Sequence, residues 1–110
     1  MTALSEPPTP SFPVAVANLG TTTALVYRAS DPIQATLVLG HGAGAPQTHP
    51  FMTDIARRIA GRGVDVVTFN FLYMEAKRKM PDRTDALEAT WRAVIASVRA
   101  RGGLPTRRVI

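Results

Sequence analysis

Residues 36–46 read TLVLGHGAGAP, and this stretch decides the fold of the chain. Its first half is a continuous apolar run, which is typical of a parallel β-strand that is covered on both faces. Its second half is a glycine-rich turn. Such a turn can direct backbone N–H groups toward a negative oxygen, on a phosphate or on a developing oxyanion. The stretch therefore predicts an α/β domain with an anion-binding loop at the end of a strand.

The flanking segments extend this pattern in both directions. Two short upstream segments, separated by the turn residues Asn18-Leu19-Gly20, predict an antiparallel hairpin. Downstream, a strand–helix–strand order predicts a right-handed crossover between parallel strands. The predicted strands lie at residues 13–16, 22–28, 36–39 and 64–69, with a fifth beginning at 107–110; the predicted helices lie at 50–60 and 84–101, with a loop at 70–80 before the second.

The two predicted helices each carry one apolar face. Pro50 suits the first helical position, with Thr48 or His49 as its cap. Apolar residues at helical spacing predict the buried faces. These residues are Phe51, Met52, Ile55, Ala56 and Ile59 in the first helix, and Leu87, Trp91, Val94, Ile95 and Val98 in the second.

Composition restricts the class of protein to which the chain can belong. Residues 1–12 contain three prolines and predict a mobile tail, which leaves residues 13–110 for a partial α/β domain. Cysteine is absent, which excludes disulfides and thiolate metal sites. No apolar run reaches the length of a membrane span, and the N-terminus has no signal-peptide pattern, so we expect a cytoplasmic protein. The net charge of +5 allows nucleic-acid binding, but no aromatic residues interleave with the basic ones as stacking platforms.

The glycine turn has three interpretations. Residues 40–45 satisfy the dinucleotide-binding pattern G-x-G-x-x-[GA], but Pro46 and Pro50 delay the helix, and the next strand ends at Asn70 without an acidic residue. A second interpretation is an oxyanion loop, whose N–H groups stabilise a tetrahedral intermediate. A third is a structural turn that only reverses the chain.

Under the oxyanion interpretation, the backbone amides of Gly42 and Ala43 are the expected donors. His41 and Gly44 are expected to brace the loop, and Asn70 and Tyr73 to line the cleft, although core packing of Tyr73 is an alternative. His41 and His49 are the only histidines, and no carboxylate cluster accompanies them. We therefore expect neither a metal site nor a cofactor.

Four segments together carry a family resemblance: GHGAG at 40–44, HPFM at 49–52, FNFLYM at 69–74 and PDR at 81–83. From about residue 35 onward, the chain resembles the N-terminal half of an α/β-hydrolase. More narrowly, it is similar to the dienelactone-hydrolase-like branch that includes the hydrolase-like domains of the testis-expressed (Tex) and non-specific-lethal-complex (KANL) proteins. The resemblance implies the strand order 1-2-4-3-5, with the two helices on opposite faces of the sheet.

The same resemblance implies hydrolysis of an ester or similar acyl bond in a small molecule by a serine nucleophile. The family's Gly-x-Ser-x-Gly nucleophile segment would follow the fifth strand, and its acid and histidine come later still. The serines here, at positions 5, 11, 30 and 97, do not lie in such a segment. We therefore expect this chain to be inactive alone, with no catalytic residue in it. A non-catalytic interaction or scaffold domain of the same fold is the alternative, and a basic nucleic-acid binder is a distant third.

Overall fold

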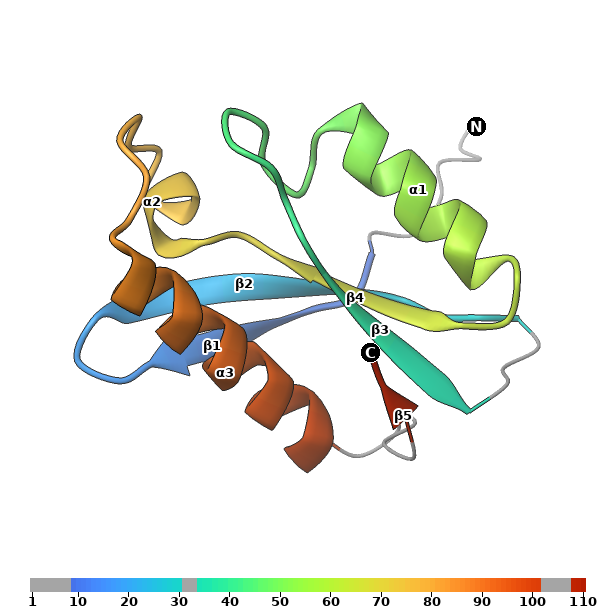
Figure 1. The fold of residues 1–110 in the computed structure, drawn as a ribbon. Coiled ribbons are helices and arrows are strands. Elements are labelled where there is room, and N and C mark those ends of the chain that lie inside the picture. The colour runs from blue at the N-terminus through green and yellow to red at the C-terminus, as the bar shows by residue number, and fades with distance from the viewer. Residues whose placement is uncertain (1–8, 31–33, 102–107) are drawn as a thin grey trace, which may run out of the picture.

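A computed structural model of the protein describes residues 9–30, 34–101 and 108–110. These residues form one mixed sheet with three helices (Figure 1), which confirms the predicted α/β class. None of the helices in the described part of the chain is long and apolar enough to cross a membrane. The elements in chain order are β1 (Ser11–Val16), β2 (Gly20–Tyr27), β3 (Ala35–Gly40), α1 (Pro50–Ala60), β4 (Asp65–Phe69), α2 (Leu72–Glu75), α3 (Thr84–Ala100) and β5 (Arg108–Val109).

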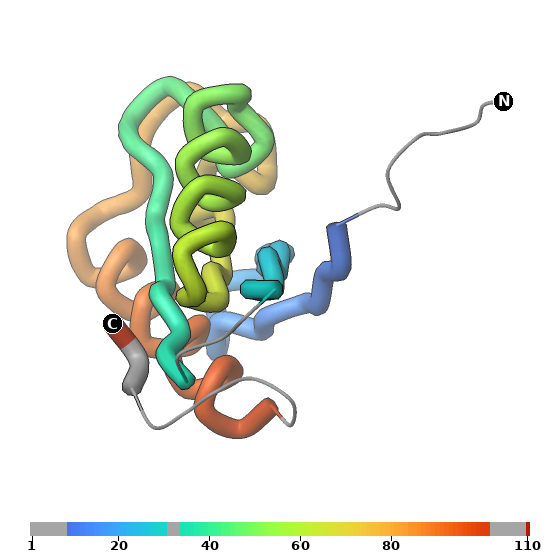
Figure 2. The backbone as a smooth tube through the Cα atoms, turned by 90° about the vertical axis from the view of Figure 1, so that its right-hand side faces the viewer, coloured from blue at the N-terminus to red at the C-terminus, as the bar shows by residue number. Residues whose placement is uncertain are grey.

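The strand order is β1-β2-β4-β3-β5, as predicted. β1 and β2 form the expected antiparallel hairpin, and β2 continues antiparallel to β4. β3 is parallel to both β4 and β5. The C-terminal end of the chain lies beside β3 (Figure 2), where Ala35 pairs with Arg108 and Thr36 with Val109.

Two apolar clusters lie on opposite faces of this sheet. Neighbouring residues of a strand point to opposite faces, so Val66 and Val67 of β4 belong to different clusters. Val67 packs in the cluster that contains Val94 of α3, and Val66 packs in the one that contains Ala56 of α1. The helices α1 and α3 therefore cover opposite faces, as the family resemblance implied (Figure 1).

The end of β3 packs closely against α3 because residue 40 is a glycine. A Cβ atom at Gly40 would lie 2.8 Å from the Trp91 ring. Trp91 packs edge-on against Phe69, with ring centroids 4.9 Å apart. The predicted core position of Trp91 is thus only partly correct, since its ring is half-buried and packs against the α3-side cluster.

The first strand begins earlier than the sequence predicts. β1 starts at Ser11 rather than at Pro13, and Phe12 is buried with 6% of its surface exposed. The proline does not break this strand because β1 is at the edge of the sheet, where proline is tolerated. The predicted end of the tail at residue 12 is therefore two residues too late, and positions 1–8 of that tail lie outside the described residues.

Two other local predictions differ from the structure. The predicted loop at residues 70–80 contains α2, a helix of four residues that is too short to show a helical period in the sequence. Phe51 is 65% exposed, because the buried face of α1 follows Met52, Ala56 and Ala60. The predicted start of α1 is confirmed, since the His49 side chain caps the helix by accepting a hydrogen bond from the Phe51 amide.

Candidate active site

The carboxyl ends of β3 and β4 meet at one edge of the sheet, because these strands are parallel and Gly40 pairs with Phe69. Ligands of α/β proteins bind at this kind of edge. Two loops lie there (Figure 1). We call residues 41–48, between β3 and α1, the glycine loop, and residues 76–81, which follow α2, the basic loop.

The tip of the glycine loop is exposed to solvent. Gly42, Ala43 and Gly44 are exposed, and Gly44 has a φ of +83°. This value matches the third position of a type II turn, where glycine is favoured, and places Ala43 at the second position. Within the described residues, no group accepts a hydrogen bond from the Gly42 or Ala43 amide. Both amides can therefore donate to a ligand.

His41 joins the start of the glycine loop to the segment after β4. Its Nδ1 donates to the carbonyl oxygen of Gly42 at 2.7 Å, and its Nε2 accepts from the Phe71 amide at 3.0 Å. This pattern fits a neutral imidazole that carries its proton on Nδ1. Because both nitrogens bond to the backbone, the buried ring braces the loop. No group of side chains among residues 9–30, 34–101 and 108–110 has the composition of a metal site.

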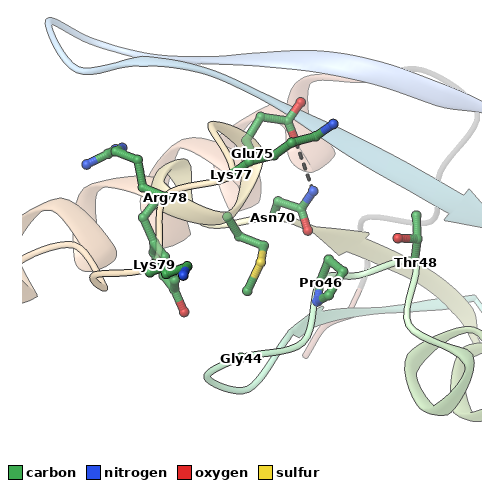
Figure 3. A pocket seen from close by; sticks show the side chains of 10 residues that line it. Gly44, Pro46, Thr48, Asn70, Glu75, Lys77, Arg78 and Lys79 are labelled. Atoms are coloured by element: carbon green, nitrogen blue, oxygen red, sulfur yellow. Dashed lines mark hydrogen bonds between the residues drawn. The ribbon is translucent and has the colours of Figure 1, made fainter.

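Asn70, the residue after β4, links the glycine loop to α2. Its Oδ1 accepts from the Gln47 amide at 2.9 Å, and its Nδ2 donates to Glu75 Oε1 at 2.9 Å (Figure 3). Tyr73 is buried, and its backbone amide donates to Asp82 Oδ2 at 3.0 Å. Core packing of the Tyr73 ring is therefore observed, and both residues also contribute to the wall of a pocket.

That pocket lies between the glycine loop and the basic loop and has a volume of about 620 Å³ (Figure 3). A volume of this size suits a small organic molecule. One wall comes from the glycine loop and the other from α2 and the basic loop. The lining residues are Gly44, Pro46, Thr48, Asn70, Tyr73, Met74, Glu75, Lys77, Arg78 and Lys79.

The structure brings three of the predicted site residues to this pocket: Gly44, Asn70 and Tyr73. Gly42, Ala43 and His41 belong to the same loop but do not line the pocket. The sequence prediction missed Gln47 and Glu75, which hydrogen-bond to Asn70. Neither has a local sequence signal, because most of their partners lie more than 20 residues away along the chain.

A family model described as an alpha/beta hydrolase domain matches residues 33–107 of the chain. The chain belongs to the alpha/beta hydrolase family. No curated protein sequence matches it.

Three solved structures share this hydrolase fold. An α/β serine hydrolase without a lid, from Xanthomonas campestris, is 23% identical with a TM-score of 0.69, covering 84% of this chain and 44% of its own. An α/β serine hydrolase homologue from Coxiella burnetii is 19% identical with a TM-score of 0.69, and the match covers 87% of this chain and 48% of that protein. A cold-adapted esterase from an Arctic intertidal metagenomic library is 18% identical with a TM-score of 0.60, and the match covers 89% of this chain and 47% of that protein.

At these identities, the similarity establishes the fold alone. The chain spans less than half the length of each of these hydrolases. Its edge with the glycine loop is therefore one part of the alpha/beta hydrolase architecture.

Proposed function

We propose that this alpha/beta hydrolase chain supplies the oxyanion side of an active site that cleaves an ester or similar acyl bond in a small molecule. Within the superfamily, we place it in the dienelactone-hydrolase-like branch, on the sequence segments described above. The observation that carries the proposal is the pair of exposed amides, Gly42 and Ala43, directly after β3. Amides aimed at the oxygen of a tetrahedral intermediate stabilise charge that develops only in the transition state.

The proposal assigns no nucleophile, acid or catalytic histidine to residues 1–110. None of the serines at positions 5, 11, 30 and 97 lies in a Gly-x-Ser-x-Gly segment. We therefore propose the activity for the whole protein to which these residues belong, which we call the full-length protein. In that protein, the glycine loop stabilises the oxyanion, and the pocket beside Asn70 holds part of the acyl substrate.

The test is to remove one amide without disturbing the turn. Ala43→Pro deletes the N–H at a position of the type II turn where proline is common. We expect the kcat of the full-length protein on a p-nitrophenyl acyl ester to fall about 100-fold to 1,000-fold, the effect of losing one oxyanion donor. KM and the melting temperature should change little, because the amide acts mainly in the transition state.

Two results would contradict the proposal. An unchanged kcat for Ala43→Pro would show that the Ala43 amide is not a donor of the oxyanion hole. The absence of both ester turnover and fluorophosphonate labelling in the full-length wild-type protein would instead favour a non-catalytic interaction domain of the same fold.

A further inference from the structure

Gln47 is a buried amide at the point where the glycine loop returns to the sheet. Only 2% of its surface is exposed. Its backbone N–H donates to Asn70 Oδ1 at 2.9 Å, and its side-chain Nε2 donates to the carbonyl oxygen of Thr23 at 2.8 Å. Its Oε1 accepts from the Thr68 hydroxyl at 2.7 Å. One residue thus ties the loop to β2, to β4 and to the segment after β4.

The partners of Gln47 are themselves held in place. Thr22 donates from its hydroxyl to the carbonyl oxygen of Asn70 at 2.6 Å, and Asn70 donates to Glu75. Thr23 donates from its hydroxyl to Glu75 Oε2 at 2.8 Å. Because buried polar groups are costly to leave unpaired, a connected set of this kind has one favoured arrangement.

The exposed turn of the glycine loop is therefore fixed at both ends. His41 holds one end through its bond to the Phe71 amide, and Gln47 holds the other. Only Ala45 and Pro46 separate Gln47 from Gly44, and proline has a fixed φ. A displacement of Gln47 would thus be passed directly to Gly42 and Ala43.

We propose that Gln47 is a positioning residue for the oxyanion amides. It does not line the pocket; it acts by fixing the place of Gly42 and Ala43. This inference rests on the proposed function, because a preorganised donor matters where a developing charge must be stabilised. This role requires no contact between Gln47 and the substrate, because all the hydrogen bonds of Gln47 are to other residues of the chain.

Gln47→Glu in the full-length protein tests the proposal through pH. A protonated glutamic acid carries a hydroxyl in place of the amide NH₂ and can still donate to the Thr23 carbonyl oxygen. The ionised carboxylate has only acceptors, and it would face that carbonyl oxygen. Burial raises the pKa of such a carboxyl group, and the Glu75 carboxylate, joined to Gln47 through Asn70, acts in the same direction.

We expect the ratio of variant kcat to wild-type kcat on p-nitrophenyl acetate to approach one at low pH. The ratio should fall at least about tenfold as the pH rises and the carboxyl ionises, with little change in KM. The matched control is Gln34→Glu, which changes the only other glutamine of the chain at an exposed site. Its ratio should be independent of pH, and a pH-independent ratio for Gln47→Glu as well would overturn the proposal.

A second measurement does not depend on turnover. In wild-type protein, the ¹⁵N order parameters of Gly42–Gly44 should be those of a rigid backbone, and they should fall in Gln47→Glu at high pH. Unchanged order parameters would overturn the positioning role. If the wild-type protein cleaves no ester but these order parameters fall, the proposed function fails while the positioning of the loop by Gln47 is supported.

A milder variant covers the case in which Gln47→Glu unfolds at high pH, which circular dichroism would report. Thr68→Val places a methyl group where the hydroxyl donates to Gln47 Oε1; the same hydroxyl also lies beside the Tyr27 phenol. We expect it to lower kcat about threefold to tenfold with folding retained, whereas Thr68→Ser, which keeps the hydroxyl, should restore most of the activity. Equal kcat values for Thr68→Val and Thr68→Ser would contradict the positioning role of Gln47.

Discussion

The two walls of the pocket are built in different ways. The glycine loop is held by buried side chains at both ends, His41 and Gln47, which bond to backbone and side-chain groups of distant segments. The basic loop is exposed along its whole length, and its bonds are local: its first three amides donate to carbonyl oxygens of residues 72–74, and Asp82 bonds to the Tyr73 amide and to Arg78 at 3.4 Å. Bonds to distant segments are thus concentrated in the wall that carries the glycine turn, and positive charge in the wall that is held by local bonds.

This contrast is most strongly tested at His41. His41→Phe keeps an aromatic ring against Phe71 and Tyr73 but leaves the Phe71 amide without its acceptor. We expect a loss of about 1–3 kcal/mol in the free energy of unfolding, the cost of an unpaired buried donor. Urea denaturation measures this change.

The control for His41→Phe is His49→Asn, which replaces the other histidine with a residue that also caps helices well. Its effect on the free energy of unfolding should be small. A loss from His41→Phe no larger than that of the control would mean that the His41 bonds add little to the glycine loop.

A smaller effect is expected within the turn itself. Gly44→Ala places a side chain at a φ of +83°, which costs about 1 kcal/mol or slightly more. Gly42→Ala is the matched change, because residue 42 does not have a positive φ and its added Cβ would meet nothing within 4 Å. Thermal unfolding of both variants gives the difference. Equal melting temperatures would show that the turn relaxes freely and is not rigid.

The smallest effect concerns the basic loop. Lys79 lines the pocket and is exposed, so Lys79→Gln should leave the melting temperature unchanged. For an ester whose acyl chain carries a carboxylate, we expect KM to rise about threefold, as for a solvent-exposed charge pair. For a neutral ester, KM should not change. Arg62→Gln, at an exposed site away from the pocket, is the control. An equal change in KM for the charged and the neutral ester would show that Lys79 does not recognise the charge of the substrate.

The same contrast explains how much could be predicted from the sequence. The hairpin, the crossover between parallel strands and the two long helices follow from local patterns, because these units depend on nearby residues. The strand order 1-2-4-3-5 was implied by the family resemblance, since local patterns do not show which distant strands become neighbours. The glycine loop was also visible locally, in residues 40–44. The role of Gln47 was not, because its partners Thr23 and Thr68 are brought to it only by the sheet. A polar residue in a loop is expected to be exposed, and only the fold shows that this one is buried.

The contact between Gly40 and Trp91 has a consequence for sequence variation. Since a Cβ atom at residue 40 would lie 2.8 Å from the indole ring, the two positions share one volume. A relative with alanine at position 40 would need a smaller side chain at position 91, while a relative with tryptophan there retains the glycine. We therefore expect the first residue of the GHGAG segment to covary with position 91 of α3, which lies 51 residues further along the chain, independently of any chemistry at the loop.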